Sequence, residues 1–148
     1  MQVMDAALDE LLRKTDAAAA LVIDRGGPLV TERGHTKEFD TTTMAALAAG
    51  SFSATQAIAE RVGENDFTSV YQQGTNHSIL VSMIDEALLM ILVFRADLGV
   101  GIMKYHAKTA IEKIATQLVK ARERTPETVD LVSMNALDAA EIFRKIGV

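Results

Sequence analysis

The chain of 148 residues contains no cysteine, no tryptophan and two prolines. Without cysteine there is no thiolate to hold zinc or an iron–sulfur cluster. No basic amino-terminal segment leads into an early apolar run, so the sequence shows no secretory signal. Together with the missing cysteines, this predicts a cytoplasmic protein.

Positive charge is also scarce. The chain has 15 lysines and arginines and 20 aspartates and glutamates, which gives a net charge of −5. A negative chain is a poor partner for nucleic acid. The basic residues that do occur gather after Gly101, which on a long helix is typical of a solvated face. The 49% of hydrophobic residues suit one domain with a substantial core.

The nineteen residues from Thr41 to Ala59 carry no charge at all. Threonines open this run, alanines fill it and Gly63 follows it, a pattern that predicts one helix. A helix without a charged face is buried all round in a soluble protein. A membrane span of about 20 residues is the competing interpretation, but four threonines, two serines and a glutamine within the run argue against it.

A helical wheel divides this helix into two faces. The expected core face consists of Met44, Leu47, Ser51, Ala54 and Ile58. The opposite face is flat, small and uncharged, and we expect it to bind a partner through Ala45, Ala49, Phe52, Ser53 and Gln56. The alternative is that loops of the same domain cover this second face.

Periodicity and turn signals predict the order αββαβββα, with a mostly antiparallel sheet of about five strands covered by helices. Pro28 places the second strand at an edge, and the seven apolar residues 88–94 suit a central strand. The expected helices span 4–15, 41–62 and 101–124, and the expected strands span 18–23, 29–32, 67–72, 78–84 and 88–94.

Residues that could perform chemistry are scattered. His35, His77 and His106 form no ligand pair at helical spacing, so we expect no metal site. Ser51 and Ser53 lack the glycine-flanked elbow of a serine nucleophile. No glycine-rich loop has the pattern of a nucleotide or phosphate site. We therefore expect no cofactor and no active site of the chain's own.

Four segments, in this order along the chain, carry a resemblance to a known family. The hairpin over 21–30, the helix segments 47–50 and 54–59, and the run Gly63-Glu64-Asn65-Asp66-Phe67 resemble the roadblock/dynein light chain family. The similarity covers about 18–120. It implies a five-stranded antiparallel sheet with one helix on one side and two on the other.

The resemblance also implies a function. Roadblock proteins homodimerise through the second helix and an edge strand, and bacterial members accelerate GTP hydrolysis by a Ras-like small GTPase. They reshape its switch regions and supply no catalytic arginine, although Arg25, Arg33 and Arg61 are candidates for such an arginine here. A scaffold that binds its GTPase or motor complex without changing hydrolysis is the alternative.

A small-molecule sensor is a further class, and it needs a polar residue within the apolar strands. Ser82 is the candidate that the sequence offers for this role. We assign residues 1–124 to the roadblock domain and 125–148 to a linker and a short amphipathic helix. That final segment either docks on the domain or is captured by a partner.

Overall fold

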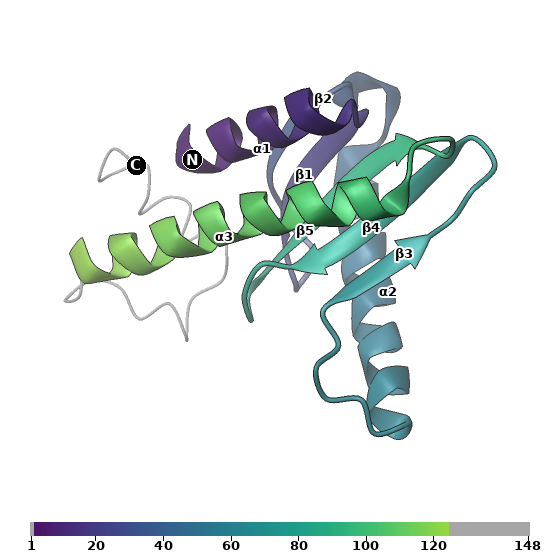
Figure 1. Cartoon of the computed structure of the whole chain (residues 1–148). Coiled ribbons are helices and arrows are strands. Elements are labelled where there is room, and N and C mark those ends of the chain that lie inside the picture. Colours follow the sequence, from purple (N-terminus) through teal and green to yellow (C-terminus); the bar gives the residue numbers. More distant parts are fainter. Residues whose placement is uncertain (1, 125–148) are drawn as a thin grey trace.

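A five-stranded antiparallel sheet forms the middle layer of the computed structural model, which describes residues 2–124 (Figure 1). The strands lie in the order β2-β1-β5-β4-β3. The helices are α1 (Gln2–Thr15), α2 (Thr41–Arg61) and α3 (Val100–Arg124), with a short 3-10 helix η1 (Thr36–Glu38), and the strands are β1 (Ala19–Asp24), β2 (Leu29–Gly34), β3 (Ser69–Gln72), β4 (His77–Met83) and β5 (Leu88–Arg95).

The predicted places of two strands are confirmed. β5 lies in the centre of the sheet, and its residues from Leu88 to Phe94 are all buried because helices cover both faces. β2, which begins directly after Pro28, lies at one edge. β3 lies at the other edge and is shorter than predicted, since residues 67 and 68 precede the ladder.

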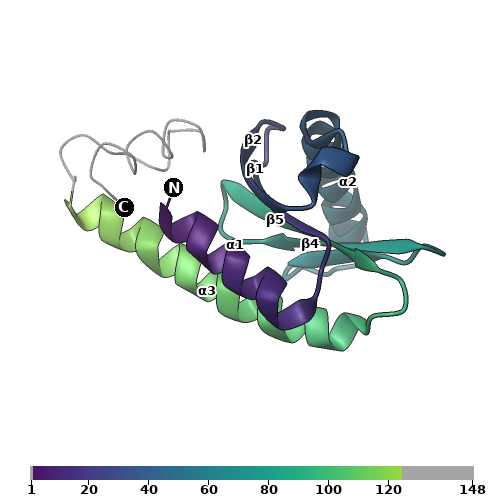
Figure 2. The same cartoon turned by 90° about the horizontal axis from the view of Figure 1, so that it is seen from above.

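Side chains alternate between the two faces of the sheet and build a separate core on each. On one face α1 and α3 pack side by side over residues such as Val22 and Leu92. On the other face α2 packs over residues such as Leu21 and Ile91. Figure 2 shows α1 and α3 below the sheet and α2 above it. This is the arrangement of two helices against one that the family resemblance implies.

An ion-pair cluster ties α1 to α3. The Nζ atom of Lys113 lies 2.5 Å from one carboxylate oxygen of Glu10, and the Nζ atom of Lys14 lies 3.1 Å from the other. Hydrogen bonds from Lys113 and Lys14 lower the pKa of Glu10 from 4.5 to about 2. The carboxylate is therefore held in its charged form between the two helices.

The linker and amphipathic helix expected over 125–148 lie outside the described residues. Their role stays a prediction.

Candidate protein-interaction surface

Local signals fix both ends of α2. The side chain of Asp40 caps the first turn by accepting hydrogen bonds from the Thr43 hydroxyl at 2.7 Å and the Thr43 backbone N–H at 3.2 Å. These two bonds hold the pKa of Asp40 below its usual range. At the other end, Gly63 adopts φ +83° and donates to the Glu60 carbonyl, while the N–H of Glu64 reaches back to the Ala59 carbonyl. This is the Schellman closure, which favours glycine at that position.

The predicted core face of α2 is wrong except at Met44, which is half-buried against the core. Ala45, Ala49 and Phe52, which the sequence assigns to a partner, lie against the chain's own sheet and are at most 4% exposed. Small residues at positions 45 and 49 let the helix approach the strands closely, and the ring of Phe52 fills the remaining space beside Phe67, with ring centroids 5.0 Å apart. These three side chains are therefore part of the core and not of the surface.

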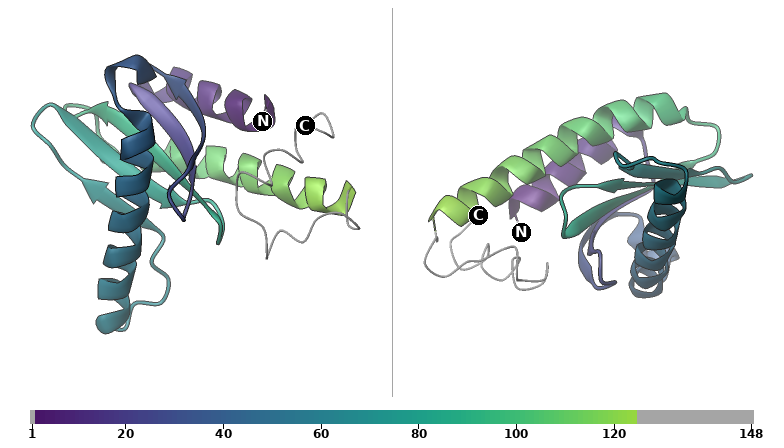
Figure 3. Two further views of the ribbon diagram at one scale, coloured as in Figure 1. Left: turned by 180° about the vertical axis from the view of Figure 1, so that it is seen from behind. Right: turned by 90° about the horizontal axis from the view of Figure 1, so that it is seen from below.

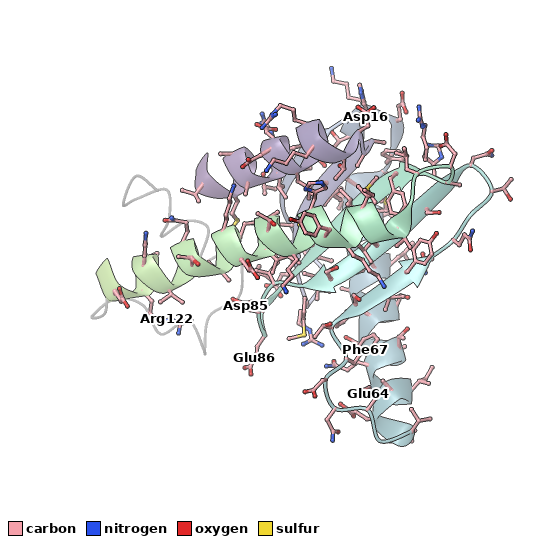
Figure 4. All side chains as sticks on the ribbon, viewed as in Figure 1. Asp16, Glu64, Phe67, Asp85, Glu86 and Arg122 are labelled. Carbon is pink, nitrogen blue, oxygen red and sulfur yellow. The ribbon has the colours of Figure 1, made fainter. Side chains whose placement is uncertain are left out.

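The outer face of α2, defined here as Leu47, Ser51, Ala54 and Ile58, points away from the sheet. Leu47 is 68% exposed and Ile58 is 65% exposed. The carboxy-terminal half of the helix projects past the sheet (Figure 3), and Figure 4 shows Phe67 beside this projecting part. The outer face is thus apolar and open to solvent.

A groove of about 250 Å³ runs beside the outer face, between α2 and the strands β3 and β4. Leu47 and Ser51 line it from the helix, and Val70 and Ile79 line it from the strands. β3 is an edge strand, so its outer backbone groups have no neighbouring strand within the described chain. The groove and the free edge adjoin each other.

The two other predicted partner-binding residues have different surroundings. Ser53 is exposed on the flank of α2 that faces away from the groove. Gln56 is half-buried, and its side-chain carbonyl accepts a hydrogen bond from the guanidinium of Arg25. Arg25 lies in the β1–β2 turn, with its guanidinium carbon 5.3 Å from the centre of the Phe52 ring. This flank is therefore built from α2 and the hairpin together.

The three candidate arginines differ in the contacts that their side chains make. Arg25 is held by Gln56 and Phe52. Arg33 makes a two-pronged contact with Asp9, with N···O distances of 2.8 and 3.0 Å. Arg61 is exposed at the last turn of α2.

The described part of the chain contains no cluster of three histidine, cysteine or acidic residues that could hold a metal ion. Among residues 2–124, no helix is long and apolar enough to cross a membrane.

One signal in the sequence could have oriented α2 correctly. Phe52 is the single aromatic residue of the helix, and a large ring is more often buried than exposed. Placing Phe52 inward also turns Ala45 and Ala49 inward. The residues of the outer face, Leu47 and Ile58, are the ones that the sequence analysis placed in the core.

The five-stranded antiparallel sheet between two helices and one helix is the fold of roadblock domains, and a comparison of the sequence with family models gives the same class. Residues 4–94 match the model of the Roadblock/LC7 domain, and the chain belongs to this family. No curated protein matches the chain.

Among solved structures, the chain is similar to MglB proteins. The gliding protein MglB from Thermus thermophilus is 35% identical with a TM-score of 0.72, and the match covers 78% of this chain and 87% of that one. A structure described as MglB with tetrameric arrangement is 34% identical with a TM-score of 0.70, covering 75% and 84%. Myxococcus xanthus MglB shares the fold with a TM-score of 0.76 at 24% identity, covering 80% and 90%. The chain is MglB-like.

Proposed function

We propose that the chain is a homodimeric regulator of a Ras-like small GTPase of the MglA type, and that it accelerates GTP hydrolysis without supplying a catalytic arginine. The observation that carries the proposal is the exposed, uncharged outer face of α2. Large apolar side chains such as Leu47 and Ile58, exposed along one face of a helix, mark a site of protein association. The resemblance to the roadblock family supplies the class of partner.

The groove and the free edge of β3 suit the homodimer. A second copy that adds its own β3 to this edge continues the sheet and brings its α2 toward the groove beside Leu47 and Ser51. Backbone hydrogen bonds then satisfy the edge strand, and apolar contact covers one flank of the helix. This surface takes the place of the one predicted at Ala45, Ala49 and Phe52.

The other flank of α2 remains open in such a dimer. It carries Gly50, Ser53 and Ala57, which are exposed, small and uncharged. Ser53 thus keeps its predicted role as a partner-binding residue, and Gln56 acts there by holding Arg25 and the β1–β2 turn. A flat surface of this kind permits close contact with the switch regions of a GTPase.

Two of the candidate arginines are already bound to other side chains of the chain, which supports activation without an arginine finger. Arg25 and Arg33 would have to leave Gln56 and Asp9 before either could reach a nucleotide. A GTPase can instead use positive groups of its own once a partner orders its switch regions and positions the attacking water.

Single-turnover GTP hydrolysis by an MglA-like GTPase, measured at increasing concentrations of this protein, tests the proposal. We expect a saturable acceleration that Ser53→Arg abolishes and that Arg61→Ala leaves unchanged. Acceleration that is lost in Arg61→Ala would instead identify Arg61 as a finger. Saturable binding without acceleration would replace the activator by the scaffold alternative, and absence of binding would overturn both.

A further inference from the structure

A second pocket lies on the face of the sheet opposite to α2. It has a volume of about 390 Å³. It lies between the first half of α3, the end of β4 and the start of β3. Figure 1 shows α3 crossing the sheet on this side. A volume of this size suits a small organic molecule. Its polar lining consists of Thr68, Ser69, Ser82, Lys104, Lys108 and Glu112.

Ser82 is the unusual member of this lining. It is 8% exposed and lies on the buried face of β4, between the apolar positions Leu80 and Ile84. Other buried hydroxyls have partners: Thr15 donates to a backbone carbonyl at 2.7 Å, and Ser78 accepts from a backbone N–H at 3.3 Å. The described part of the chain provides no such side-chain bond for Ser82.

The Ser82 hydroxyl is accessible to solvent, because Oε2 of Glu32 is the one fully buried side-chain polar atom without a partner among the described residues. The hydroxyl of Ser82 lines the pocket, where a ligand can supply the missing bond. Ser69 is its direct partner across the β3–β4 ladder and lines the same pocket. Two hydroxyls of neighbouring strands therefore share one cavity.

Two lysines bring positive charge to the pocket. Lys104 and Lys108 lie one turn apart on α3 and are both exposed. Within residues 2–124 neither forms a salt bridge, whereas Lys113, further along the same helix, is bound to Glu10. The ammonium groups at this pocket are thus available to an anion.

We propose that this pocket binds the phosphate monoester of a small soluble molecule. The ammonium groups of Lys104 and Lys108 outnumber the carboxylate of Glu112, so the lining attracts an anion, and the hydroxyls of Thr68, Ser69 and Ser82 add donors for the three terminal oxygens of a phosphate. The apolar side chains of Ala107 and Ile111 form a wall for the organic part. A carboxylate has fewer acceptor oxygens, so it matches this donor set less well. The pocket is independent of the proposed GTPase-binding surface because the sheet separates the two.

Methyl NMR of the full chain tests this proposal, with the Ala107 and Ile111 methyl groups as reporters. The probes are inorganic phosphate and glycerol 3-phosphate, each compared with chloride at constant ionic strength. We expect both probes to shift the two reporters saturably, with the larger shift from the ester.

Variants distinguish specific binding in the pocket from non-specific attraction of anions to the positive charge of α3. The double variant Lys104→Gln/Lys108→Gln should weaken apparent phosphate affinity about tenfold or more, and Ser82→Ala should weaken it while leaving the fold intact. The matched control is Lys120→Gln/Arg122→Gln, which removes the same charge from α3 outside the pocket and should leave affinity unchanged.

Three results would overturn the proposal. The first is the absence of saturable shifts with either probe, and the second is an equal loss of affinity in the control variant. The third is binding to vesicles that contain phosphatidic acid without any response to the soluble probes, because the ligand would then be a lipid headgroup.

Discussion

The guanidinium of Arg25 donates a hydrogen bond to the side chain of Gln56, 31 positions along the chain. It also lies over the ring of Phe52, and the backbone N–H of Arg25 donates to the Ala87 carbonyl at 3.0 Å. One residue thus joins the β1–β2 turn, the β4–β5 turn and the middle of α2. This contact positions the hairpin beside the exposed flank of α2.

Removing either partner of this contact should destabilise the chain, and the two losses should not add. In a double-mutant cycle of Arg25→Ala and Gln56→Ala we expect a coupling free energy of about 1 kcal/mol. Urea unfolding at one fixed protein concentration measures it. Arg13→Ala, on the exposed side of α1, is the control, and a cycle with Arg13 in place of Arg25 should give no coupling.

Opposite outcomes are expected when charge is introduced on the two faces of α2. Ala49→Arg places an unpaired charge against the sheet and should cost about 3 kcal/mol or more, so that the fold itself is lost. Leu47→Arg should keep the circular dichroism spectrum and abolish self-association, as measured by light scattering. A folded, dimeric Leu47→Arg protein would contradict the proposed dimer surface.

Glu10 should make stability depend on pH. Its pKa is lowered to about 2 in the folded chain by Lys113 and Lys14, below the ordinary value of 4.5. The contribution of Glu10 is therefore fully present above pH 4.5 and is lost as the pH falls toward 2. The urea midpoint of Glu10→Gln should lie below that of the parent at pH 7, and the difference should shrink by pH 2.

The same comparison at high salt provides the control, because these side chains are partly exposed and salt screens them. A difference between Glu10→Gln and the parent that is unchanged from pH 7 to pH 2 would show that the carboxylate charge does not link α1 to α3.

Two glycines should respond to alanine with opposite signs. Gly34 has φ +96°, and a Cβ atom there would lie 2.5 Å from the Ala18 carbonyl oxygen, so Gly34→Ala should destabilise by about 1–3 kcal/mol. Gly50 lies within α2 with open space around its missing Cβ, so Gly50→Ala should stabilise by about 1 kcal/mol. Thermal unfolding at matched concentration measures both, and equal signs would contradict the assignment.

The sequence predicted the sheet better than the surface. Alternation and turn residues identified every strand, and Pro28 with the apolar run 88–94 identified an edge strand and the central strand. These signals are local, because a buried strand differs in polarity from an exposed one. The strand order required pairing between distant segments, such as β1 with β5, which no local pattern contains.

The face of α2 was predicted wrongly for a physical reason. Hydrophobic periodicity separates apolar positions from polar ones, but the whole of α2 up to Ala59 is uncharged. The face of α2 that binds a partner is then as apolar as the face that packs on the chain's own core, and periodicity does not distinguish them. Leu47 and Ile58 have the hydrophobicity of core residues, and the signals that favour the other face are the ring of Phe52 and the small size of Ala45 and Ala49.

Few residues of α2 are buried against the sheet, so the stability of this helix depends on whether a partner binds it. Three of its residues are buried, and its last turns extend past the sheet, whereas α1 and α3 support each other on the opposite face. We expect α2 to open locally at a lower free energy than the strands beneath it. A partner on the outer face stabilises the helix by mass action. Amide hydrogen exchange within α2 would thus report occupancy of this surface, and the helix would act as a ligand-dependent folding unit on an otherwise persistent scaffold.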